Sequence, residues 1–209
     1  MDGVMSDMEK ILVWDIPTRI GHWLLVAAFV VSYLSGDSEA WRLVHVTAGF
    51  ALAGVLLFRL FWGVAGTRYA RFKSFMFSPR QVYAYLGSLL KGKPAHWVGH
   101  NPAGSYAIYA LIFLGVSVVG SGWAVYAEVG GDWLEEAHDT LSYAMLFVVG
   151  VHVAGVVVSS RLHQENLVRS MITGYKQGRA EQGIASNKKY WLILLLGSVV
   201  SASLLALAN

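Results

Sequence analysis

Five long apolar stretches divide this chain, and polar segments separate them. Each stretch has about the 20 apolar residues that an α-helix needs to cross the hydrocarbon core of a bilayer. The pattern therefore predicts an all-α integral membrane protein with five transmembrane helices. The first stretch lacks the small-residue cleavage site of a signal peptide, so we expect it to stay in the protein. The stretches cover residues 16–36, 41–64, 103–127, 134–159 and 190–208.

The composition agrees with a membrane protein and narrows its chemistry. Charged residues make up 14% of the chain, whereas soluble domains carry about 25%. The chain has no cysteine, which excludes disulfides, cysteine-ligated iron–sulfur clusters and covalently attached c-type haem. Neither of the glycine-rich nucleotide-binding motifs is present, so nucleotide binding has no support.

The cations are distributed very unevenly between the two sides of the predicted spans. Of the 16 Lys and Arg residues, only Arg42 falls in an outer loop. The positive-inside rule therefore places the N-terminus and the long loops in the cytoplasm, and five spans place the C-terminus outside. Because topology explains the basic balance, we expect no nucleic-acid partner. The fifteen inner cations are Lys10, Arg19, Arg59, Arg68, Arg71, Lys73, Arg80, Lys91, Lys93, Arg161, Arg169, Lys176, Arg179, Lys188 and Lys189.

One short helix is predicted outside the spans, within the cytoplasmic segment 75–92. Ser78 followed by Pro79 is a helix-start signal, and apolar residues recur after it at helical spacing. We expect this helix to lie on the inner membrane surface. An ordinary amphipathic connector and a docking surface for a partner are both compatible with the pattern.

Four histidines form the most informative pattern. His138 and His152 are 14 residues apart on one predicted helix, which is a rotation of about 1400° and a rise of roughly 21 Å, so both face the same side at opposite depths. His45 matches the outer depth of His138, and His22 lies near the inner end, as His152 does. Neutral imidazole is a strong axial ligand of haem iron. The pattern predicts two bis-histidine haems, with His45 and His138 holding the outer one and His22 and His152 the inner one.

Two arginines lie close to these histidines. Arg19 is about one turn before His22, and Arg42 is three residues before His45. Each could pair with haem propionates through charge-assisted hydrogen bonds. Simple anchoring at the membrane interface is the alternative for Arg19.

The polar turn before the third span is a candidate quinone site. It reads His100-Asn101-Pro102-Ala103-Gly104, and Pro102 suits the first turn of a helix. His100, Asn101 and the free N–H groups near Gly104 could hydrogen-bond a quinone carbonyl. A helix cap that binds no ligand is the alternative. We expect the remaining histidines, His96 and His163, to be solvated or interfacial.

Several local motifs resemble those of the bacterial cytochrome b561 and nickel–iron hydrogenase b-type cytochrome family, which is also similar to the membrane subunit of formate dehydrogenase. The resemblance runs from Val13 to about Gln177. Its motifs are Trp14-Asp15-x-x-x-Arg19-x-x-His22-Trp23, His45, Gly99-His100-Asn101-Pro102-x-Gly104, the spacing from His138 to His152, and Glu165-Asn166-Leu167-Val168-Arg169-Ser170-Met171-Ile172-Thr173-Gly174.

The resemblance implies four core helices, two b haems in a bacterial inner membrane and electron exchange with the quinone pool. It assigns the haem ligands in the same pairs as above, and it places a quinone near Asn101 and Gly104. We accordingly expect a di-haem cytochrome b domain over residues 1–180. Residues 181–209 would then form a linker and an additional transmembrane helix.

Three functions are compatible with these features. The first is an electron-transfer subunit that links a periplasmic partner, either a cytochrome c or a dehydrogenase or hydrogenase, to quinone. The second is a self-contained superoxide:quinone oxidoreductase that uses the outer haem. The third is a non-haem transporter in which the histidines serve ions or protons. Whether the chain is itself an enzyme stays open at this level.

Overall fold

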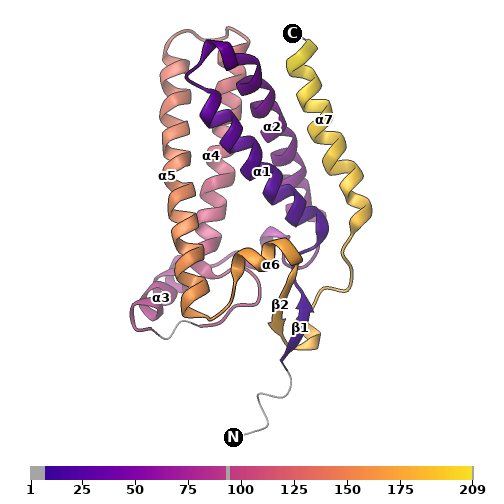
Figure 1. Ribbon diagram of the computed structural model, residues 1–209. Coiled ribbons are helices and arrows are strands. Elements are labelled where there is room, and N and C mark those ends of the chain that lie inside the picture. The colour runs from indigo at the N-terminus through magenta and orange to yellow at the C-terminus, as the bar shows by residue number, and fades with distance from the viewer. Residues whose placement is uncertain (1–7, 93–94, 209) are drawn as a thin grey trace, which may run out of the picture. The chain divides into compact units, whose positions relative to one another are not determined.

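The five predicted spans are long helices in the computed structural model, which describes residues 8–92 and 95–208 (Figure 1). All five are long and apolar enough to cross a membrane, and their ends lie within a few residues of the predicted ones. The described residues do not include Lys93 or residues 1–7. Part of the predictions on charge and topology concerns those residues. The helices are α1 (Ile16–Ser35), α2 (Arg42–Ala65), α4 (Pro102–Tyr126), α5 (Trp133–Leu162) and α7 (Leu192–Ala208).

The short helix predicted within residues 75–92 is also confirmed, as α3 (Pro79–Leu90), whereas its place on the inner membrane surface stays a prediction. Ser78 caps it by accepting a hydrogen bond from the backbone N–H of Gln81, and the Gln81 side chain bonds back to the backbone of Ser78. This reciprocal capping box satisfies two donors that a helix start leaves open. One further helix follows α5, α6 (Leu167–Thr173), and short 3-10 turns cover Glu39–Trp41, Phe72–Phe75, Ala180–Gln182 and Lys189–Trp191.

Two short strands supplement the all-α prediction. Strand β1 (Glu9–Leu12) pairs antiparallel with β2 (Tyr175–Gly178), with Glu9 opposite Gly178 and Leu12 opposite Tyr175. Each has only four residues, too few for an alternating pattern to stand out in the sequence. Their pairing depends on a contact between segments far apart in the chain, which local patterns do not encode.

The chain forms two compact units. Unit 1 comprises residues 1–19, 61–108 and 151–189, and unit 2 comprises residues 20–60, 109–150 and 190–209. The core of unit 1 contains Ile11, Val13, Trp14 and Tyr69 beside the two strands. The expected division of the chain at residue 180 stays a prediction.

Gly174 shows why unit 1 needs a glycine after α6. Its φ of +90° lies in the left-handed region, and a Cβ there would come within 2.7 Å of the carbonyl oxygen of Trp14. The backbone N–H groups of Val13 and Trp14 donate to the Gly174 carbonyl at 2.8 and 3.0 Å. The turn therefore ties the end of α6 to the segment that leads into α1.

In unit 2, the fifth span packs directly against the second. The Ser198 hydroxyl of α7 donates to the Gly54 carbonyl of α2 at 3.0 Å. A Cβ on Gly54 would lie 2.5 Å from the Ser198 carbonyl oxygen, so the backbones of the two helices come close together here. Small residues commonly allow such approach between membrane helices.

Candidate functional site

Two of the four predicted ligands, His45 of α2 and His138 of α5, face each other in unit 2. Their ring centres are 6.1 Å apart, and their planes are nearly perpendicular at 86°. Both side chains are half-buried. The structure therefore brings together the pair that was predicted to lie at the outer depth.

Backbone carbonyls orient both imidazoles. Nδ1 of His45 lies 2.8 Å from the Ser32 carbonyl oxygen of α1, and Nδ1 of His138 lies 3.1 Å from the Val118 carbonyl oxygen of α4. An Nδ1–H that donates to a carbonyl selects the tautomer whose Nε2 carries a free lone pair. This is the usual outer-shell arrangement of metal-ligating histidines.

The ring spacing fits two axial ligands on one metal ion. A metal–imidazole bond is about 2 Å long and the ring centre lies roughly another ångström behind the nitrogen, so two such rings have centres about 6 Å apart. No cluster of three or more His, Cys, Asp or Glu residues that could hold a metal occurs among the described residues. Haem brings four nitrogens of its own, so two imidazoles would complete the coordination of its iron.

Glycines leave room beside both rings. A Cβ on Gly122 of α4 would lie 2.8 Å from Cε1 of His138, and a Cβ on Gly36 would lie 3.5 Å from the His45 ring. Neither glycine belongs to a motif recognised in the sequence. Neither stands near its histidine in the chain, so no local signal could have identified them.

The second predicted pair is divided between the two units. His22 belongs to unit 2, where its ring packs edge-on against Trp23 with centres 5.1 Å apart. His152 belongs to unit 1 and is half-buried. Helix α5 carries both His138 and His152, as expected. The pairing of His22 with His152 stays a prediction.

The two arginines have protein partners. The guanidinium of Arg19 donates to the carbonyl of Ile172 near the end of α6, and its Nε is buried without a hydrogen-bond partner. Arg42 forms an ion pair with Glu39 at 3.8 Å, and both side chains are largely exposed. Their predicted contacts with haem propionates stay predictions.

The Asn101 turn forms the helix cap that the sequence offered as an alternative to a quinone site. Oδ1 of Asn101 accepts a hydrogen bond from the N–H of Gly104 at 2.7 Å, and Nδ2 donates to Oγ of Ser159 at 3.2 Å. The His100 ring packs between Trp14 and Phe75, with ring centres 4.7 and 4.5 Å away. Binding of quinone here stays a prediction.

Asp15 is a structural residue whose role was not predicted from the sequence. The side chain is fully buried. Its carboxylate accepts from the Thr18 N–H at 2.7 Å, from the Trp62 indole at 3.1 Å and from the Thr67 hydroxyl. Asp15 thus caps α1 and connects it to the end of α2. Its position just before an apolar stretch was the available signal, because aspartate is a preferred N-cap.

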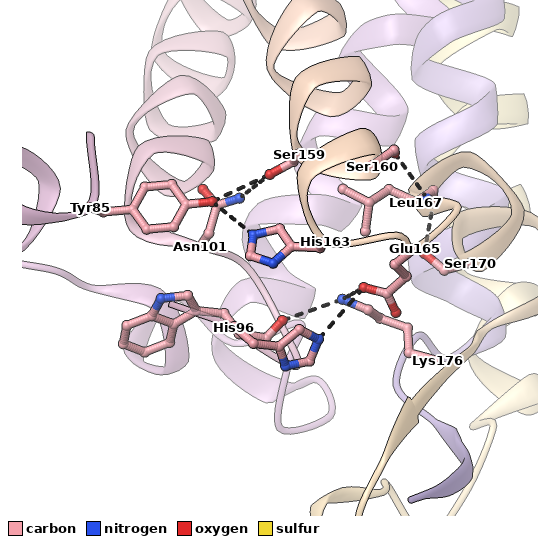
Figure 2. A network of polar contacts seen from close by, with 11 residues as sticks. Tyr85, His96, Asn101, Ser159, Ser160, His163, Glu165, Leu167, Ser170 and Lys176 are labelled. Atoms are coloured by element: carbon pink, nitrogen blue, oxygen red, sulfur yellow. Dashed lines mark hydrogen bonds and ion pairs between the residues drawn. The ribbon is translucent and has the colours of Figure 1, made fainter. Parts of the chain in front are cut away.

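A polar network lies near the Asn101 turn in unit 1 (Figure 2). Lys176 is buried and pairs with Glu165 at 3.0 Å, and His96 lies 3.9 Å from the same carboxylate. His163 contacts the Tyr85 hydroxyl at 3.5 Å. Burial lowers the pKa of His163, His96 and Lys176 lower it further, and Glu165 opposes them. His96 is 44% exposed, as expected, but His163 belongs to this network rather than to solvent alone.

Comparison with known proteins found a matching family and several similar proteins. The model of the prokaryotic cytochrome b561 family matches residues 13–174. A probable Ni/Fe-hydrogenase B-type cytochrome subunit of Rhodobacter capsulatus is 23% identical over 84% of this chain and 87% of its own length. The corresponding proteins of Cupriavidus necator and Escherichia coli K12 are each 25% identical, covering 82% and 85% of this chain and 88% and 94% of their own. The comparison with solved structures found no match.

Proposed function

Because the chain belongs to the prokaryotic cytochrome b561 family, we propose that it carries electrons between a periplasmic redox partner and membrane quinone through two bis-histidine b haems. Family membership by itself makes it a multi-pass membrane b-type cytochrome. The number of haems, their ligands, the quinone site and the partner are the finer parts of the proposal.

The observation that carries the proposal is the facing pair of His45 and His138. Haem b, when bound, supplies a one-electron redox centre. The two Nε2 atoms would hold the iron, and the carbonyls of Ser32 and Val118 would keep both rings in the ligating tautomer. Those carbonyls also make the imidazoles more basic ligands.

The second haem is assigned to His22 and His152. The support is the spacing of His138 and His152 on one continuous helix, α5. About 21 Å of rise separates them, which would place one haem towards each membrane surface. Arg19 and Arg42 would neutralise propionates on the inner and outer side, respectively.

A hydrogenase is the favoured partner. The relatives are named as probable Ni/Fe-hydrogenase cytochrome subunits and match along most of their length. The present chain has no cysteine, so a cysteine-ligated cluster that delivers electrons would belong to the partner. The asymmetry of Lys and Arg supports a bacterial inner-membrane protein with a cytoplasmic N-terminus and a periplasmic C-terminus.

The haem assignment is tested by stoichiometry and by single-ligand variants. We expect two haems per chain in a pyridine haemochrome titration against protein mass. His138→Ala should remove one midpoint potential in a redox titration and His152→Ala the other, while His96→Ala, which changes an exposed histidine, should remove neither. A ratio near one in the wild-type protein, or loss of the same component in both ligand variants, would refute the assignment.

The quinone site is tested at Asn101. Asn101→Leu keeps the bulk and removes the hydrogen bonds, and a lost bond to a neutral ligand costs about 0.5–1.5 kcal/mol. We therefore expect quinol analogues to bind roughly threefold to tenfold more weakly, with haem content unchanged. Asn101→Asp is the matched variant, because its carboxylate can still cap α4 but cannot donate as the amide does. Unchanged quinol affinity in Asn101→Leu would exclude this site.

A further inference from the structure

Four side chains connect the Asn101 turn to the cytoplasmic loops by successive hydrogen bonds (Figure 2). Nδ2 of Asn101 donates to Oγ of Ser159 at 3.2 Å. That oxygen lies 3.3 Å from the Tyr85 hydroxyl, which in turn lies 3.5 Å from Nε2 of His163. Tyr85 and Ser159 are buried, with 4% and 5% of their surface exposed. The series therefore runs through the interior of unit 1, from the turn before α4 and from α5 to α3 and the loop after α5.

The hydrogen bonds of this series can be oriented in two opposite directions. Because the Asn101 amide can only donate to Ser159, the Ser159 hydroxyl is left with its own proton to give. In one direction Ser159 donates to Tyr85 and Tyr85 donates to a neutral His163. In the other, His163 donates to Tyr85, Tyr85 donates to Ser159, and the Ser159 proton points away from the series. Hydroxyls rotate and imidazole has two tautomers, so both directions satisfy every member.

Switching between these directions moves one proton along the series. A proton that binds Nδ1 of His163 releases the one on Nε2 to Tyr85. Tyr85 passes its own proton to Ser159, and Ser159 releases its proton beside Asn101. Each O–H bond that breaks is replaced by another, so no residue keeps a net charge. Rotation of the two hydroxyls and exchange of the imidazole tautomer restore the starting state.

Resting on the proposed function, we propose that Ser159, Tyr85 and His163 form a proton wire between cytoplasmic water and the quinone beside Asn101. Reducing a quinone to its quinol takes up two electrons, supplied by the proposed electron path, and forms two O–H bonds with two protons. Oxidising a quinol releases the same two electrons and two protons. Each switch of the series transfers one proton, towards the quinone or away from it.

Charged neighbours complete the cytoplasmic end of the wire. The rings of His96 and His163 have centres 5.7 Å apart, and the partly exposed His96 meets the solvent. Glu165 lies beside both, with one carboxylate oxygen bound to Lys176 and the other buried without a hydrogen-bond partner. The Glu165 carboxylate favours a proton in transit on the His163 imidazole, and the Lys176 ammonium opposes it.

The experiment measures haem reduction by a soluble quinol analogue in the purified full-length, haem-loaded protein, in H2O and in D2O. Tyr85→Phe keeps the ring and removes the relaying hydroxyl. General acid–base groups typically contribute 10²–10⁴-fold, and water can substitute in part, so we expect a rate at least about tenfold lower. The affinity for the quinol and the haem content should stay as in the wild-type protein. Tyr83→Phe, on the same helix but 76% exposed, is the matched control and should leave the rate unchanged.

A second variant separates proton transfer from a purely structural role. His163→Ala should slow the reaction, and added imidazole should restore it, because the free base can occupy the space and relay protons. An unchanged rate and solvent isotope effect in Tyr85→Phe would overturn the wire, as would a His163→Ala defect that imidazole does not relieve. If Asn101→Leu weakens quinol binding while Tyr85→Phe has no effect, the wire alone is wrong. If Asn101→Leu binds quinol normally, the quinone site is wrong, and the wire loses its end point with it.

Discussion

Replacing Gly122 with alanine should selectively damage the proposed haem site at His45 and His138. The added Cβ would lie 2.8 Å from Cε1 and 3.2 Å from Nδ1 of the His138 ring. Ordinary contact begins at 3.4 Å, so the ring must retreat by about 0.6 Å. It is held on one side by its hydrogen bond to the Val118 carbonyl. If Nε2 of His138 holds a haem iron as proposed, an iron–nitrogen bond of about 2 Å could not lengthen by that amount and remain strong.

Overpacking of this kind typically costs about 1–3 kcal/mol. If the cost falls on the ligand geometry, the outer haem should be held roughly 5- to 150-fold more weakly. The assay is the haem-to-protein ratio after dilution into haem-free detergent buffer, followed by redox titration and electron paramagnetic resonance of the low-spin signals. We expect loss or a marked shift of one midpoint and one signal, with the other unchanged.

Gly120→Ala is the matched control, because it adds the same methyl group to the same helix where nothing lies within 4 Å. His138→Ala is the reference variant, which should lose the proposed outer haem completely. If Gly122→Ala keeps its haem, midpoint potentials and spectra at the values of Gly120→Ala, His138 does not hold an iron in this geometry.

Three further predictions concern the stability of the fold, measured by thermal unfolding in detergent. Gly54→Ala should lower the unfolding temperature, because its Cβ would lie 2.5 Å from the Ser198 carbonyl oxygen. Gly197→Ala, with open space around it, should not, and equal unfolding temperatures of the two variants would contradict the close packing of α7. Asp15→Ala should lower the free energy of unfolding by about 1.5–3 kcal/mol, because the Trp62 indole N–H and the Thr67 hydroxyl lose their shared acceptor. A smaller loss than on replacing an exposed aspartate would contradict the structural role of Asp15. Burial lowers the pKa of His163 in the folded state, so its stabilising contribution is present above the ordinary value of 6.5 and is lost as the pH falls through the folded-state pKa. The wild-type protein should therefore lose more stability than His163→Gln between neutral and mildly acidic pH, and parallel curves would show that His163 is not responsible.

The five spans and the helix α3 could be predicted because their signals are local. A run of apolar residues long enough to cross a bilayer has few alternatives to a helix, since lipid offers no partners for backbone N–H and C=O groups. The Ser78-Pro79 start of α3 is likewise contained within one turn. The positions of His138 and His152 follow from the regular rotation of a single helix, and the structure keeps that helix continuous.

Contacts between segments far apart in the chain could not be predicted from the sequence. The pairing of β1 with β2, the burial of Asp15 against Trp62 and the approach of Gly122 to His138 each join residues from separate parts of the chain. No periodicity records such a contact, because it depends on how separate segments of the chain pack together.

The same distinction applies to the chemistry of the candidate sites. Residue type and helical spacing by themselves indicated that histidines at two depths could ligate haem, because imidazole chemistry and helix geometry are properties of the chain alone. Only the tertiary structure decided that the rings of His45 and His138 face each other, and that each Nδ1 lies against a backbone carbonyl of another helix. The tertiary structure also decided that Ser159, Tyr85 and His163 form one hydrogen-bonded series. Orientation and connectivity arise from packing in three dimensions, which a linear pattern does not contain.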